Sequence, residues 1–88
     1  MRFLVALYLQ DVYNRVIDEL RIIERTKSEE HEFIVSVVSR CNLNEEQIIV
    51  YLNDRLEAEF LPWKIRDTYV PKARALWLRV TCINLTDL

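Results

Sequence analysis

The chain has 88 residues, of which 51% are hydrophobic and 30% are charged, and its formal net charge is −2. This hydrophobic content predicts a single folded domain over residues 1–88 and excludes a disordered chain. Glycine is absent, which excludes a glycine-rich phosphate-binding loop and disfavours the tight turns of two-residue β-hairpins.

The first predicted element is a helix from about residue 4 to about residue 26. Its apolar positions recur at helical spacing and comprise Leu4, Tyr8, Leu9, Val12, Val16, Ile17, Leu20 and Ile23. The alternative is a strand that ends near Leu9, followed by a shorter helix capped by Asp11. The first two turns of the long helix are apolar on every side, and such a surface has to be covered. We therefore expect a homodimer built on this helix through Phe3, Leu4, Leu7 and Tyr8, unless the C-terminal segment folds over it.

A pair of helices is predicted next, over Ser28–Cys41 and from Glu45 to about Ala58. Ser28 is a good N-cap for the first helix. Its apolar stripe comprises Phe33, Ile34, Val37, Val38 and Cys41. Asn42 can end that helix, and Asn44 with Gln47 is close to a capping box for the second.

The spacing of apolar residues and helix caps from Val37 to Leu52 resembles that of the helix-turn-helix and winged-helix superfamily. The residues that carry the resemblance are Val37, Val38, Asn42, Leu43, Asn44, Ile48 and Leu52. Asn42 stands where that superfamily most often has glycine. The resemblance implies two helices at a steep angle, followed by a β-hairpin wing. A helical hairpin in a small bundle explains the same pattern.

The last third of the chain alternates apolar and polar residues with the two-residue period of a strand. The period covers Trp63–Tyr69 and Leu76–Ile83, and Val70–Ala73 can form the turn between them. We predict a β-hairpin here. A fourth helix that begins at Pro71 is the alternative. The expected fold is thus mainly α (α+β), a three-helix core with a C-terminal β-hairpin, or else a four-helix all-α bundle.

Charge is unevenly distributed along the chain. Acidic residues outnumber basic ones between residues 29 and 59, whereas basic residues outnumber acidic ones between 61 and 82. The acidic residues predicted to form a protein-binding face are Glu29, Glu30, Glu45, Glu46, Asp54 and Glu57. Such a face favours a partner with a basic surface.

The basic segment also contains aromatic residues, as nucleic-acid-binding proteins do. Its candidate residues are Trp63, Lys64, Arg66, Lys72, Arg74 and Arg79, and Tyr69 and Trp77 could add stacking surfaces. The more economical interpretation places these aromatic side chains in the core. Glu45 and Glu46, which begin the would-be recognition helix, oppose its use on DNA.

No catalytic or metal-binding pattern is found. His31 is the only histidine, and Cys41 and Cys82 have no neighbouring ligand at metal spacing. We expect no enzymatic activity, no cofactor and no metal. No signal peptide or membrane-spanning run is evident, so a cytoplasmic protein that does not bind membranes is expected. The predicted function is a small protein-binding module of the inhibitor or adaptor type, with nucleic-acid binding as the alternative.

Overall fold

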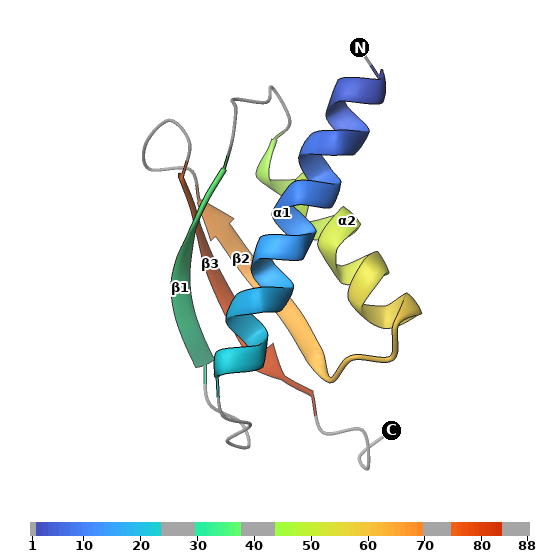
Figure 1. Cartoon of the computed structure of the whole chain (residues 1–88). Coiled ribbons are helices and arrows are strands. Elements are labelled where there is room, and N and C mark those ends of the chain that lie inside the picture. Colours follow the sequence, from blue (N-terminus) through green and yellow to red (C-terminus); the bar gives the residue numbers. More distant parts are fainter. Residues whose placement is uncertain (1, 24–29, 38–43, 70–74, 84–88) are drawn as a thin grey trace.

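The structure, a computed structural model, describes residues 2–23, 30–37, 44–69 and 75–83. The elements follow the order α1 (Arg2–Ile22), β1 (Glu30–Ser36), α2 (Glu45–Ala58), β2 (Trp63–Tyr69) and β3 (Ala75–Cys82). They form two layers, in which α1 and α2 lie together on one face of an antiparallel sheet (Figure 1). We call the opposite face, away from both helices, the open face of the sheet.

The sheet has the strand order β1-β3-β2, so the last strand of the chain lies in the centre. β1 and β2 are both antiparallel to β3, and Trp77 of β3 faces Ile34 of β1 and Tyr69 of β2. A β-bulge between Ile65 and Asp67 leaves Arg66 without an opposite residue on β3.

The predicted fold class is wrong. The described residues form two helices and a three-stranded antiparallel sheet, an α+β fold. Neither the three-helix core with its helix-turn-helix pair nor the alternative four-helix bundle is present in the described part of the chain. The pairing of β2 with β3 agrees with the predicted C-terminal hairpin, although its turn at Val70–Ala73 lies outside the described residues.

The error arose at Glu30–Ser36, which is strand β1 where a helix was predicted. His31, Phe33 and Val35 point toward the helices, and exposed residues alternate with them. Phe33, Ile34 and Val37 fit a helical stripe and a strand equally well, because a short apolar run carries both periods. The proposed caps at Ser28 and Asn42 lie outside the described residues.

The long N-terminal helix is confirmed, and the alternative of an initial strand is wrong. α1 begins at Arg2 and ends at Ile22, earlier at both ends than the predicted range. Val12, Val16 and Leu20 recur every four residues and are buried against the sheet and α2. α1 is therefore one of the two helices that cover the inner face of the sheet.

Local chemistry explains where α2 begins and ends. The Asn44 side chain accepts a hydrogen bond from the Gln47 N–H at 2.8 Å, and Gln47 Oε1 accepts one from the Asn44 N–H at 3.1 Å. This reciprocal pair is the capping box expected from the sequence. At the other end, Phe60 adopts a left-handed conformation with φ of 55°. The Leu61 N–H then donates to the Leu56 carbonyl at 3.0 Å, which closes the helix in a Schellman motif.

The hydrophobic core lies between the two helices and the inner face of the sheet. Each element contributes to it, and the largest fully buried side chains are Ile48, Leu52, Leu56, Ile65, Leu76, Leu78, Val12, Val16 and Val80. Trp63 is also buried there, and its ring meets that of His31 edge to face at 5.9 Å. Alternate residues of β3 face the core, as do Trp63, Ile65 and Thr68 of β2 on either side of the bulge. The remaining residues of both strands form the open face.

Among the described helices, none is both long enough and apolar enough to cross a membrane.

Candidate functional site

The open face is the surface on which unusual side chains gather. Antiparallel register places its residues in rows across the three strands. The first row consists of Ile34, Trp77 and Tyr69, and the second of Glu32, Arg79 and Asp67. We call the first of these the apolar row and the second the charged row.

The apolar row is exposed to solvent. Ile34 is 60% exposed and Tyr69 is 56% exposed, while Trp77 between them is half-buried. Single exposed apolar side chains are ordinary, but three adjacent ones on a sheet face form a contiguous patch. The Arg79 guanidinium carbon lies 5.8 Å from the centre of the Trp77 ring, so the patch borders directly on a cation.

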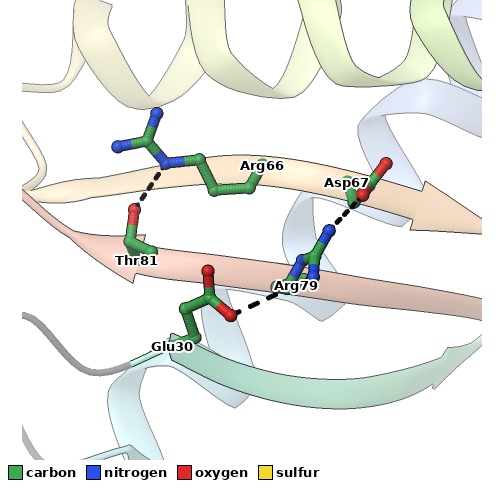
Figure 2. A network of polar contacts seen from close by, with 5 residues as sticks. All are labelled: Glu30, Arg66, Asp67, Arg79 and Thr81. Carbon is green, nitrogen blue, oxygen red and sulfur yellow. Dashed lines mark hydrogen bonds and ion pairs between the residues drawn. The ribbon is translucent and has the colours of Figure 1, made fainter.

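Arg79 is held in place from two sides. One of its terminal nitrogens bonds Asp67 of β2, and the other lies 4.0 Å from a carboxylate oxygen of Glu30 of β1 (Figure 2). Beside this network, Arg66 Nε donates to Thr81 Oγ1 at 2.9 Å. The Arg79 contacts reach both neighbouring strands, and the Arg66–Thr81 bond adds a second link between β2 and β3.

The charges of the open face balance within the described residues. Its acidic residues are Glu30, Glu32 and Asp67, and its basic residues are Lys64, Arg66 and Arg79. The basic segment predicted from the sequence is therefore partly neutralised by acids of β1 and by Asp67. A surface with this balance has no net attraction for a phosphate backbone.

The nucleic-acid-binding residues predicted from the sequence are only partly brought together, because Lys64, Arg66 and Arg79 share the open face and Trp63 does not. Lys64 and Arg66 are exposed on β2, and Arg79 lies in the ion-paired network. Trp63 is buried in the core and offers no stacking surface. Lys72 and Arg74 lie outside the described residues.

The predicted acidic face is divided between the two layers. Glu45, Glu46, Asp54 and Glu57 are exposed on α2, with the exposed Val50 among them. Glu30 lies on the open face instead, and Glu29 is outside the described residues. A partner cannot contact the open face and the outer side of α2 through one flat surface.

The predicted self-association residues are also placed unequally. Leu7 is 48% exposed, whereas Tyr8 is half-buried and packs against the core. Phe3 and Leu4 belong to α1, but their side chains are not among those described.

A pocket of about 610 Å³ lies between α1, the end of α2 and the start of β2. Three of its polar residues contact one another: the Tyr13 hydroxyl donates to Glu59, and the Arg55 guanidinium lies 4.3 Å from the Tyr13 ring centre. Arg55 also donates to the Tyr51 hydroxyl at 2.9 Å. No serine, threonine, cysteine or histidine is among the described residues that line this pocket.

In the described part of the chain, no three of the residues His, Cys, Asp and Glu form a group that could hold a metal ion. Comparisons with protein families, curated proteins and solved structures find no match for this chain.

The apolar row is not predicted as a unit from the sequence. Ile34 falls in a predicted helix, and Tyr69 and Trp77 are predicted only as additional stacking surfaces beside Trp63. The available sequence signal was the aromatic and β-branched run Phe33-Ile34-Val35 within the segment Glu30–Ser36, which favours a strand. Read as a strand, that segment places Ile34 on the face opposite Phe33 and Val35.

Proposed function

We propose that the protein is a non-enzymatic protein-binding module and that its partner docks on the open face of the sheet. The observation that carries this proposal is the apolar row of Ile34, Trp77 and Tyr69 beside the ion-paired Arg79. Trp, Tyr and Arg are the residues most enriched among those that dominate protein–protein binding energy.

The chemistry of the open face indicates the kind of protein surface that fits it. An apolar side chain of the partner would cover the apolar row, and polar groups of both signs would meet the charged row. Arg79 is already oriented by Asp67 and Glu30, so binding costs little additional side-chain entropy. A partner with an apolar centre and a mixed-charge rim is complementary to this arrangement.

The acidic residues of α2 remain a separate proposed surface for a basic partner. Glu46, Val50, Asp54 and Glu57 are all exposed on this helix. Acidic side chains at such a position chiefly increase the association rate and select against acidic partners. A contact here would leave the open face unoccupied, so the two surfaces can be tested independently.

Nucleic-acid binding is the second candidate, and one observation favours it. Tyr69 and Trp77 are adjacent aromatic residues on neighbouring strands of an open sheet, with exposed Lys64 and Arg66 on the same face. Aromatic residues on open sheets can stack on unpaired bases. The balanced charge of the face makes a protein partner the better fit.

The test uses a phage-displayed random peptide library, selected on the wild-type protein and counter-selected on Tyr69→Ala/Trp77→Ala. Val50→Ala is the matched control, because Val50 is a similarly exposed apolar residue on α2. We expect the selected peptides to share an apolar motif and to bind the wild type and Val50→Ala equally well. They should bind the double variant at least about tenfold more weakly, which corresponds to a loss of roughly 1.4 kcal/mol of binding free energy.

The single variant Tyr69→Ala keeps the test valid if the double variant does not fold, because Tyr69 lies on an outer strand and is exposed. Peptides that bind all variants equally, or no enrichment at all, would refute the proposal. Fluorescence anisotropy with labelled single-stranded DNA and RNA decides the alternative. Binding that weakens steeply with salt and is lost in Tyr69→Ala would establish nucleic-acid binding in place of protein binding.

A further inference from the structure

The two outer strands of the sheet are protected unequally. Along the outer edge of β2, the Asn53 side chain bonds both backbone groups of Ile65, and the bulge at Arg66 breaks the regular edge. β1 pairs with β3 on one side, and the described part of the chain places no strand on its other side. We propose that a second copy of this chain pairs with this edge of β1, antiparallel to it, to form one continuous sheet from both copies.

Backbone N–H and C=O groups along a strand point alternately to one neighbouring strand and to the other. This alternation identifies which residues of β1 have backbone groups free to pair with an added strand. The Ile65 N–H and carbonyl point at Asn53 and hence away from β3. Val80 lies opposite Ile65, so its own backbone groups point toward β1, where it faces His31. Alternation along β1 then directs the backbone groups of Glu30, Glu32, Ile34 and Ser36 outward, toward an added strand.

Few two-fold registers are possible for a β1–β1 pair. Residues directly opposite each other in an antiparallel pair lie on the same face of the sheet. The two-fold axis must therefore pass through one residue, which faces its own copy. The candidates inside β1 are His31, Glu32, Phe33, Ile34 and Val35. Centring the pair on Val35 includes only residues 34–36 of each β1, whereas centring it on Ile34 includes residues 32–36, so the Val35 register is the weaker of these two.

Charge and polarity decide among these registers. Centring the pair on Glu32 opposes two identical carboxylates, and centring it on His31 places Glu30 opposite Glu32 of the second copy. Centring it on Phe33 places the exposed Ile34 opposite the Glu32 carboxylate. Centring it on Ile34 avoids all three conflicts, because Ile34 faces Ile34 and Glu32 faces Ser36.

The Ile34-centred register also satisfies both faces of the sheet. On the inner face, Phe33 lies opposite Val35 of the second copy, so apolar residues meet on the side of the helices. On the open face, the two apolar rows join end to end through the Ile34 pair. The side chain of Ile34, 60% exposed in one copy, gains an apolar neighbour.

This interface differs from the one predicted from the sequence, which used α1. Leu7 is the described residue that best represents the α1 interface, because it is 48% exposed. Ile34 represents the β1 interface. Variants at these two positions therefore distinguish the two modes of dimer formation, and neither depends on whether the open face binds another protein.

The first experiment measures mass by light scattering over a range of protein concentrations. The wild type should approach twice the chain mass of 10.6 kDa, and Leu7→Glu should remain dimeric. Ile34→Pro should give the mass of one chain, because proline removes an N–H that only the added strand would use. Ile34→Lys provides a second variant that blocks pairing if Ile34→Pro does not fold, since like charges would then face each other.

Circular dichroism shows which variants are folded. A wild type that stays monomeric throughout the concentration range would overturn the proposal. So would a folded Ile34→Lys variant that remains dimeric, or a dimer that Leu7→Glu alone dissociates.

A disulfide experiment tests the register itself. Ile34→Cys in a Cys41→Ser/Cys82→Ser background should form an intermolecular disulfide on mild oxidation, because facing residues of an antiparallel pair have Cα atoms about 5.5 Å apart. Glu32→Cys in the same background is the matched control and should form far less, since its proposed neighbour is Ser36. Equal disulfide formation at both positions, or formation at Glu32→Cys alone, would overturn the Ile34-centred register.

Discussion

The side-chain amide of Asn53 on α2 bonds both backbone groups of Ile65 on β2. Asn53 Nδ2 donates to the Ile65 carbonyl at 3.0 Å, and Asn53 Oδ1 accepts from the Ile65 N–H at 2.8 Å. The amide thus replaces a neighbouring strand at this point. It anchors the helix to the sheet and protects the outer edge of β2 from pairing with another chain.

The first prediction concerns this contact. Asn53→Leu leaves the backbone groups of the buried Ile65 without their partners, so we expect the free energy of unfolding to fall by about 1–3 kcal/mol. Urea denaturation measures the change. Asp54→Ala is the matched control, because Asp54 is the exposed next residue of α2, and its effect should stay within about 0.5 kcal/mol. An Asn53→Leu variant as stable as the wild type would show that the Asn53 amide does not contribute to the free energy of unfolding.

The second prediction concerns the end of α2, where Phe60 has φ of 55° and is 87% exposed. A left-handed conformation costs a residue with a Cβ atom about 1–2 kcal/mol, and glycine avoids this cost. Phe60→Gly should therefore stabilise the protein by about 1 kcal/mol, since little packing is lost.

Thermal denaturation tests this prediction as an increase in Tm. Ala58→Gly, two residues earlier in the same helix, is the control, and it should destabilise by about 1 kcal/mol because its conformation is helical. If both glycine variants lowered Tm, the left-handed conformation at Phe60 would be disproved as a source of strain.

The third prediction tests the core between the two layers. Leu52 of α2 is fully buried, with an exposed fraction of 0%. Leu52→Ala removes buried apolar atoms and leaves a cavity, so the free energy of unfolding should fall by about 2–5 kcal/mol. Val50→Ala on the exposed side of the same helix should change it by less than about 0.5 kcal/mol. Similar losses for the two variants would mean that α2 does not present Leu52 to the sheet.

The fourth prediction concerns the bond that joins α1 to the end of α2. The buried Tyr13 donates its hydroxyl hydrogen to Glu59. Tyr13→Phe keeps the ring under Arg55 but removes this donor, so the free energy of unfolding should fall by about 0.5–1.5 kcal/mol. A double-mutant cycle with Glu59→Ala isolates the bond, because Tyr13→Phe should have no further effect once Glu59 is gone. Strictly additive effects would contradict the contact.

The amino-acid sequence by itself determined the elements whose signals are local or long. Asn44 and Gln47 form a reciprocal cap within four residues, so the start of α2 could be predicted without knowledge of its neighbours. α1 repeats its apolar stripe over several turns, and β2 and β3 alternate strictly enough to indicate strands. In each case the preferred prediction followed the side-chain period that one backbone geometry satisfies better than its alternative.

Only the tertiary structure determined that Glu30–Ser36 forms a strand. As a result, it also determined which residues make up the open face. As an isolated segment, Phe33, Ile34 and Val37 suit either a helix or a strand. β3 resolves the choice, because its second side offers backbone hydrogen bonds that a strand can pair with and a helix cannot. Pairing in that register places Ile34 beside Trp77 and Glu30 near Arg79, two contacts between residues far apart in the chain. Such contacts depend on strand order and register, which are properties of the assembled sheet and not of any one segment.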